Sequence, residues 1–172
     1  IIHKIKNSKT IIMITTPLLV IFMVAVFLLL FLFFNTVDKR KWLTTLISLV
    51  LTPFVYYFMF YPFLNIISSY HHQKYFDSEA WTENPAYRYE MIDHTITSDT
   101  LIGASKERII KLLGNHEWLS WDDSLKVHAE DKWNYSLGIE PGAFNNNKEC
   151  IEITFEKDKV VALKTFQEEI TF

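Results

Sequence analysis

Two long stretches of this chain contain no charged residue, and they constrain the fold more than any other feature. Residues 10–37 and residues 42–73 include no Asp, Glu, Lys or Arg. A helix needs roughly 20 apolar residues to cross the hydrocarbon core of a bilayer. The sequence therefore predicts two transmembrane helices, over about residues 11–34 and about residues 43–67.

The connection between the predicted spans is short, which restricts how they can be arranged. Asn35–Trp42 is too short to hold a domain, so the spans are expected to form an antiparallel helical hairpin. Trp42 then lies at the membrane interface, where indole rings are enriched. Pro53 and Pro62 flank an aromatic run in the second span, and a proline inside a helix kinks it.

Three tyrosines, Tyr56, Tyr57 and Tyr61, lie near the exit of the second predicted span. They are interpreted either as an interfacial aromatic belt or as a packing face for another membrane subunit. Neither span holds an Asp, Glu, Lys, Arg or His. Because proton relays and ion pathways need ionisable residues at membrane depth, a transporter-like role for this chain alone is not expected.

Charge is divided unevenly along the chain. Residues 1–66 hold six basic residues and one acid, a net charge of +5, whereas residues 67–172 hold 11 basic and 19 acidic residues, a net charge of −8. Nucleic acid is not expected as a partner, because its phosphates repel an acidic surface. The length of the acidic part suffices for one compact domain.

Sidedness is predicted from the basic residues that flank the spans. Two spans place both of their outer ends on one side of the membrane. Lys39, Arg40 and Lys41 are concentrated in the hairpin loop, and the N-terminal tail holds three further lysines. Since loops rich in Lys and Arg stay in the cytoplasm, we expect a cytoplasmic hairpin loop and a soluble domain on the outer face.

Two helices are predicted at the start of the soluble domain. Asn84 and Pro85 are typical of a helix start, as the N-cap and first-turn residues. Ser105 is the expected N-cap of a second helix, and Gly114 stands where a glycine ends a helix.

The rest of the domain has the alternating pattern of β-strands. Strands are predicted over residues 133–139, 148–156 and 159–166, with a tight hairpin at Lys157–Asp158. The predicted fold class is α+β: an antiparallel hairpin of two transmembrane helices, followed by a small ααβββ domain with a three-stranded antiparallel sheet. Residues 1–67 are then the hairpin, residues 68–83 a juxtamembrane tether and residues 84–172 the soluble domain.

A predicted loop over residues 115–131 contains two tryptophans between acidic residues, Trp118 and Trp121. Tryptophan is common in cores, and an exposed tryptophan is typical of an interface, so both interpretations are open. The candidate partner-binding residues are therefore Trp118, Trp121, Tyr56, Tyr57 and Tyr61.

No residue pattern typical of catalysis or metal binding occurs in the chain. It contains no Gly-x-Ser-x-Gly, His-x-x-x-His or Cys-x-x-Cys motif, and its single cysteine, Cys150, excludes an internal disulfide. We therefore expect no catalytic residue, no cofactor and no metal. A metal or haem site shared with another subunit is an alternative, and metal analysis of the purified chain tests it.

A series of short motifs is spread over residues 84–166. It consists of Arg88-x-x-Met91, Leu101-x-Gly103-x-Ser105, Leu113–Gly114, Trp133-x-Tyr135-x-Leu137–Gly138, and Ile151-x-Ile153-x-Phe155 followed by Val160. In order and spacing the series resembles the BamE family of small outer-membrane-assembly lipoproteins, also described as SmpA/OmlA-like domains. The resemblance implies an ααβββ domain that binds protein partners and has no catalytic centre.

The chain departs from this family in how it is anchored. It has no lipobox cysteine, and Asn115–His116 replaces the proline that usually follows Leu-Gly in the family. Helical spans belong to a bacterial inner membrane rather than an outer one, so the expected location is the inner membrane, with the domain in the periplasm.

These observations predict a non-catalytic accessory or assembly subunit of a larger bacterial membrane protein complex, which presents a protein-binding domain at the membrane surface. Its expected partners are other membrane protein subunits and the lipid bilayer. The alternative is a membrane-tethered sensor module that binds a small ligand or a peptide.

Overall fold

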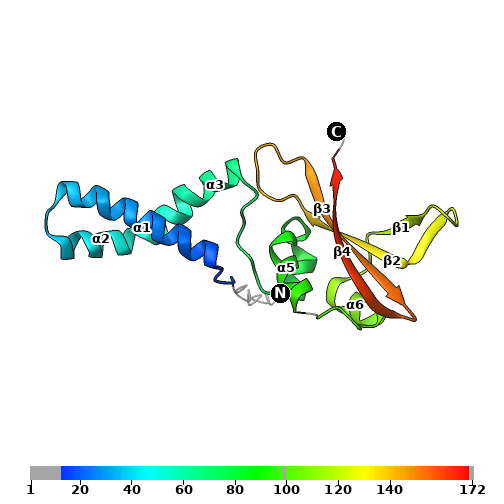
Figure 1. Cartoon of the computed structure of the whole chain (residues 1–172). Coiled ribbons are helices and arrows are strands. Elements are labelled where there is room, and N and C mark those ends of the chain that lie inside the picture. The colour runs from blue at the N-terminus through cyan, green and yellow to red at the C-terminus, as the bar shows by residue number, and fades with distance from the viewer. Residues whose placement is uncertain (1–12, 99, 171–172) are drawn as a thin grey trace, which may run out of the picture. The chain divides into compact units, whose positions relative to one another are not determined.

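The computed structural model describes residues 13–98 and 100–170, which form two compact units (Figure 1). Of the described residues, the helical unit comprises 15–72, the loop 139–147 and 169–170. The sheet unit comprises residues 13–14, 73–138 and 148–168.

The helical unit is built from two apolar helical runs. The first is α1 (Pro17–Val37), which begins with Thr16 accepting a hydrogen bond from the Leu19 N–H and with a proline in the first turn. The second run, Lys41–Ile67, has 27 residues. Both runs are long and apolar enough to cross a membrane, as the sequence predicts; Ile11 and Ile12 of the first expected span lie outside the described residues.

The second helical run changes its hydrogen bonding midway. It consists of α2 (Lys41–Val55), a π-helical turn η1 (Tyr56–Phe60) and α3 (Tyr61–Ile67). Pro53 lies inside α2 and a second proline in the first turn of α3. Because a proline cannot donate the backbone hydrogen bond of its position, the ladder shifts register, and a π-helical turn accommodates the shift.

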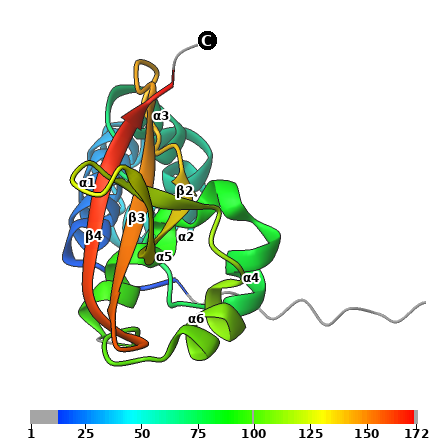
Figure 2. The ribbon, with the colours of Figure 1, turned by 90° about the vertical axis from the view of Figure 1, so that its right-hand side faces the viewer.

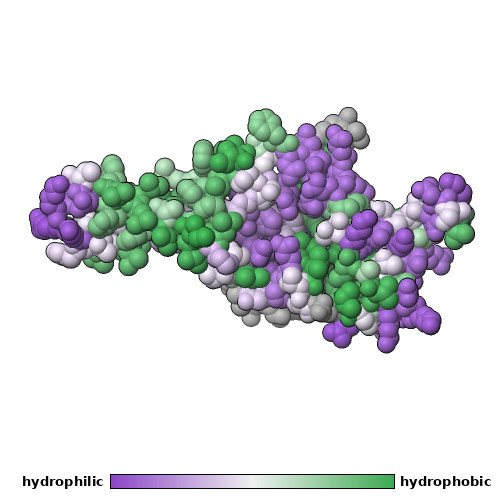
Figure 3. All heavy atoms as spheres, viewed as in Figure 1, coloured by the Kyte–Doolittle hydropathy of each residue, from purple (hydrophilic) through white to green (hydrophobic). Residues whose placement is uncertain are grey.

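Small polar side chains hold the two helices together. The buried residues of α2 are Thr44, Ser48 and Thr52, spaced four apart on one face, and those of α1 are Leu19 and Val26. Small side chains let helix backbones approach closely. Most other side chains of the hairpin point outward, so that hydrophobic residues cover its surface and hydrophilic ones gather at its turn (Figure 3).

The sheet unit has its short helices before its strands. The helices are α4 (Ser78–Glu83), the 3₁₀ turn η2 (Pro85–Tyr87), α5 (Tyr89–Thr97) and α6 (Lys106–Leu113). The strands are β1 (Trp118–Asp122), β2 (Val127–Gly138), β3 (Asn147–Glu156) and β4 (Lys159–Glu169), and they form one antiparallel sheet in the order β1-β2-β3-β4. Figure 2 shows β3 and β4 side by side.

The α+β class is as predicted, but the expectation of three strands is wrong, because the sheet has four. The additional strand is β1, within the segment predicted as a loop; it pairs Trp118 with Asn134 and Trp121 with His128. A register shift between Leu119 and Trp121 interrupts the pairing. This irregularity breaks the alternation by which a strand is recognised in a sequence.

Local signals in the domain correspond to the observed ends of elements. The Ser105 hydroxyl accepts from the Arg108 N–H at the start of α6, and Gly114, with φ of 83°, ends that helix. Lys157 and Asp158 both have positive φ, as a two-residue hairpin turn requires.

One hydrophobic core joins the helices to one face of the sheet. Trp81 of α4, Ile109 of α6, Tyr135 of β2 and Ile153 of β3 are fully buried within it. The segment 68–83, expected as a tether, therefore differs from that expectation, since it includes α4 and a core tryptophan. The physical reason is long-range: Trp81 packs edge-on to Tyr135, 54 residues later in the chain, with ring centroids 6.4 Å apart.

Arg88 links the helices to the sheet through a buried side chain. Its Nε donates to the Trp81 carbonyl at 2.8 Å, and its Nη1 donates to the Ser136 carbonyl at 2.9 Å and to the Glu117 carboxylate at 2.5 Å. The second carboxylate oxygen of Glu117 accepts from the Ser136 N–H. A buried guanidinium is stabilised when its donors are bonded, and here Nε and Nη1 together make three hydrogen bonds.

Candidate functional site

An aromatic cluster surrounds the π-helical turn of the helical unit. Tyr56 and Tyr61 stack against each other at 6.2 Å between ring centroids, and His72 stacks on Tyr61 at 4.0 Å. Tyr70 packs edge-on to Tyr61 and to Phe22 of α1. The cluster thus packs the segment that follows α3, residues 70–72, against both helices.

Hydrogen bonds fix this cluster at its centre. The hydroxyl of Tyr56 and Nε2 of His72 share a hydrogen bond of 2.9 Å, in which the imidazole tautomer decides the donor. The Tyr56 hydroxyl also lies 3.4 Å from that of Tyr70, whose backbone carbonyl accepts from Asn65 Nδ2. Tyr56 is fully buried and His72 nearly so, so the network is internal to the chain.

The three predicted tyrosines therefore differ in what they offer to a partner. Tyr56 is enclosed by its own chain, whereas Tyr57 is 42% exposed on the next position of the turn. Sequence reasoning missed the contributions of Tyr70 and His72. Their only signal was the run of aromatic and histidine residues after the second span, and its meaning depends on the chain folding back.

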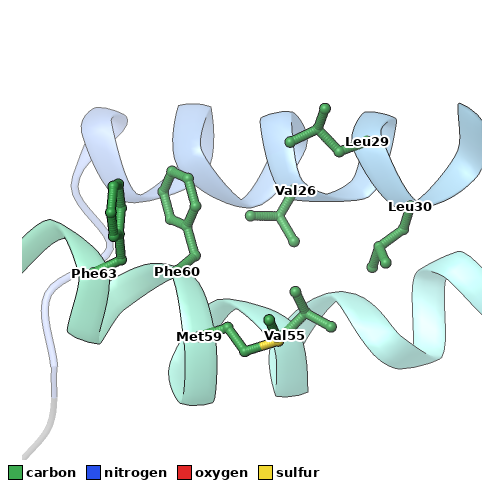
Figure 4. Close-up of a pocket in the computed structure, with 7 residues that line it drawn as sticks. All are labelled: Val26, Leu29, Leu30, Val55, Met59, Phe60 and Phe63. Atoms are coloured by element: carbon green, nitrogen blue, oxygen red, sulfur yellow. The ribbon is translucent and has the colours of Figure 1, made fainter. Parts of the chain in front are cut away.

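An apolar groove lies between the two helices, beside this cluster. It has a volume of about 430 Å³, and Figure 4 shows side chains of both helices directed into it. Its lining residues are Val26, Leu29, Leu30, Val55, Met59, Phe60 and Phe63. With no charged or hydrogen-bonding side chain in its walls, the groove can accept only an apolar group.

The two predicted tryptophans lie on the β1–β2 hairpin and not in a loop. Trp118 is half-buried, with Lys148 Nζ 4.8 Å from its ring centroid. Trp121 is 53% exposed and meets the His128 ring edge-on at 5.2 Å. The structure thus separates them into one partly covered and one open side chain.

Two further apolar side chains extend the open surface at Trp121. Leu125 is 71% exposed and Val127 is 50% exposed. We call Trp121, Leu125 and Val127 the hairpin-tip surface. A β-hairpin that leaves three large apolar side chains in water is typical of an interaction site, because burying them against a partner releases the water around them.

The turn of this hairpin is held by an acidic side chain. The Asp122 carboxylate accepts hydrogen bonds from Ser124 and from the Leu125 N–H. These bonds, led by that from the Ser124 hydroxyl, lower the pKa of Asp122 because they favour its charged form. Asp122 therefore organises the turn, and a hairpin with fixed geometry presents its tip in a fixed orientation.

The sheet unit also has a small polar hollow of about 270 Å³. Lys74 and Glu90 form an ion pair of 2.5 Å across its lining. The hollow is smaller than the usual size of a small-molecule site, and its charged groups are already paired.

Titratable and metal-ligating side chains are scattered in the part of the chain that the structure describes. Within residues 13–98 and 100–170, no three His, Cys, Asp or Glu side chains are grouped so that they could hold a metal ion. Cys150 is buried, and burial raises the pKa of its thiol to about 11.

Comparisons of this chain with protein-family models, with curated proteins and with solved structures found no match.

Proposed function

We propose that this chain is a non-catalytic accessory or assembly subunit of a larger bacterial membrane protein complex. In this proposal the helical unit crosses the inner membrane twice, and the sheet unit is a BamE-like, protein-binding domain in the periplasm. The observation that carries the proposal is the outward apolar surface of the helical unit, combined with the exposed hairpin-tip surface of the sheet unit.

The burial pattern of the helices supports membrane insertion. A core helix of a water-soluble protein is mostly buried, whereas α1 buries only Leu19 and Val26. Leu29 and Leu32, for example, are 63% and 62% exposed. An apolar surface this extensive is stable when lipid covers it, and the backbone polar groups of an α-helix are satisfied internally, as a bilayer requires.

The hairpin-tip surface supports a protein partner. Tryptophan is among the residues most enriched at the energetic centre of protein interfaces. Trp121 lies beside acidic Asp122 and Asp123, so the complementary partner surface is an apolar pocket with basic residues at its rim. Anchoring in the membrane raises the effective concentration of such a binder near partners in the same bilayer.

Membrane insertion is tested by extraction. Washing membranes with alkaline carbonate, which strips peripheral proteins, should leave the full chain in the pellet, and detergent should release it. A chain that remains soluble in plain buffer would contradict the proposal, because apolar helices with this exposure aggregate in water.

The protein partner is tested by crosslinking in intact cells followed by mass spectrometry, with a matched pair of variants. Trp121→Ser should remove a specific crosslinked subunit. Val161→Ser, at an exposed apolar position of β4, is the control and should retain it. Recovery of the natural chain as a lone monomer, or equal crosslinking by both variants, would count against the hairpin-tip surface as the partner site.

A further inference from the structure

The loop 139–147, which connects β2 to β3, belongs to the helical unit. Its Ala143 N–H donates to the Ile66 carbonyl at 3.0 Å, so it satisfies one of the carbonyls left open at the end of α3. A Cβ added to Gly142 would lie 3.9 Å from the Ser68 carbonyl oxygen, which also places the loop against the end of this helix. The loop is therefore fixed at the level where the second predicted span ends.

Phe144 follows directly after this attachment point. It is 95% exposed, more than any other large apolar side chain among the described residues. At the end of α3, Phe63, Ile66 and Ile67 are each more than half exposed. Phe144 thus adds an exposed apolar side chain next to the point where the loop is bonded to the end of α3.

The backbone of the loop is suited to a position near lipid because several of its polar groups are bonded within the protein. The Asn145 N–H donates to the Gly142 carbonyl, and Asn145 Nδ2 donates to the Glu140 carbonyl. Asn145 Oδ1 in turn accepts from the Asn147 N–H, and the Asn146 carbonyl accepts from the Ile170 N–H. Irregular backbone near hydrocarbon is tolerated only when its hydrogen bonds are satisfied in this way.

We propose that the loop 139–147 is a third membrane-contacting segment, in which Phe144 inserts at the boundary between lipid headgroups and acyl chains beside the end of α3. This inference rests on the proposed insertion of the helical unit. An amphipathic or aromatic anchor at this depth gains by burying its apolar surface without crossing the bilayer. The occupant is lipid because the loop is bonded to the end of α3, where Phe63, Ile66 and Ile67 are exposed apolar residues.

The test is site-directed spin labelling of the full chain in phospholipid vesicles. A nitroxide is attached at Phe144→Cys, and its collision rates with oxygen, which concentrates in the bilayer, and with a water-soluble nickel chelate are measured. The natural chain is the labelling blank, because Cys150 is fully buried. Labels at Leu29→Cys and Leu125→Cys, both at exposed positions, are the lipid and water references.

At position 144 we expect the ratio of oxygen accessibility to chelate accessibility to be greater than one. It should be closer to the ratio at position 29 than to the ratio at position 125. A ratio at 144 equal to that at 125, with position 29 in lipid, would overturn this inference and leave the proposed membrane insertion intact. A water-like ratio at position 29 would overturn both. Since the vesicles contain no other protein, a lipid-like signal at 144 cannot come from burial against a different subunit.

Discussion

Gly138 lies where two backbones meet, at the end of β2. Its φ is +97°, and a Cβ at this position would be 2.1 Å from the Ala86 carbonyl oxygen. Gly138→Ala therefore introduces both backbone strain and a clash that a side-chain rotation cannot relieve. We expect the free energy of unfolding to fall by about 2–4 kcal/mol, as measured by denaturation of the full chain in detergent micelles.

Gly103 supplies the matched control. Its φ is +76°, but a Cβ there would meet nothing within 4 Å. Gly103→Ala should thus cost only the left-handed backbone strain, about 1–2 kcal/mol. If the two variants lose the same free energy of unfolding, the close contact between Gly138 and Ala86 does not constrain the domain.

Tyr135 makes the stability of the sheet unit sensitive to alkali. Its hydroxyl donates to the Gly114 carbonyl at 3.0 Å. Burial raises its pKa, and the Glu117 charge adds to this effect while Arg88 opposes it. Because the folded-state pKa lies above the unfolded one, the stabilisation is fully present below about pH 10 and is lost as the pH rises further.

The buried Cys150 thiol also makes the stability of the sheet unit fall as the pH rises, and its effect begins at a lower pH than that of Tyr135. Its pKa is raised from 9.0 to about 11, so its contribution is complete below pH 9 and lost between those values. We expect the thermal midpoint to fall between pH 9 and pH 11, and to fall less steeply in Tyr135→Phe. A thermal midpoint that does not change between pH 9 and pH 11 would contradict the claim that these two buried groups stabilise the fold only when protonated.

At the scale of elements, the contact between α1 and α2 depends on small side chains. The hydroxyl of Thr52 donates to the Ser48 carbonyl, whereas the Ser48 hydroxyl is buried and makes no hydrogen bond to any described residue. Ser48→Ala should therefore change the free energy of unfolding by no more than about 1 kcal/mol. Ser48→Leu should lower it by about 1–3 kcal/mol, because the added atoms separate the helices.

Helix content measured by circular dichroism in increasing concentrations of SDS distinguishes these variants. The transition of Ser48→Leu should move to lower SDS than that of the natural chain, and Ser48→Ala should remain close to it. If Ser48→Leu is as resistant to SDS as the natural chain, the face of α2 formed by Thr44, Ser48 and Thr52 does not determine how the helices pack.

The segment that follows α3 depends on the hydroxyl of Tyr56. Tyr56→Phe removes the hydrogen bond to His72 while keeping the ring in place, at an expected cost of about 1 kcal/mol. Amide hydrogen exchange should then become faster over residues 70–72. Tyr87→Phe, at an exposed position of η2 outside this cluster, is the control, and equal acceleration over residues 70–72 in that variant would contradict the role of the Tyr56 hydroxyl.

How much of each element was predictable depends on the range of the interactions that form it. The helix from Ser105 to Gly114 and the turn at Lys157–Asp158 are set by neighbouring residues, so their sequences were sufficient. By contrast, α4 is fixed by Trp81 packing on a strand far along the chain, and β1 is a short edge strand with a register shift. The aromatic cluster was missed for the same reason, because His72 meets Tyr56 only after the chain reverses.

For the molecule as a whole, the distribution of charge gives the clearest prediction. The turn between α1 and α2 holds Lys39, Arg40 and Lys41, and Arg40 is paired with Asp38 at 3.6 Å, so most of the positive charge of the turn is uncompensated. Transfer of such a turn across the membrane of the proposed topology is unfavourable. The turn should therefore be cytoplasmic and the sheet unit periplasmic.

Labelling of introduced cysteines with a membrane-impermeant maleimide tests this sidedness in intact spheroplasts. Asp123→Cys, at the exposed hairpin tip, should react before lysis. Val37→Cys, at the exposed end of α1, should react only after lysis, and it leaves the charges of the turn unchanged. In the proposed topology the turn and the sheet unit lie on opposite sides of the bilayer. The reverse pattern would therefore place the sheet unit in the cytoplasm, and its partner would then have to be sought on that face.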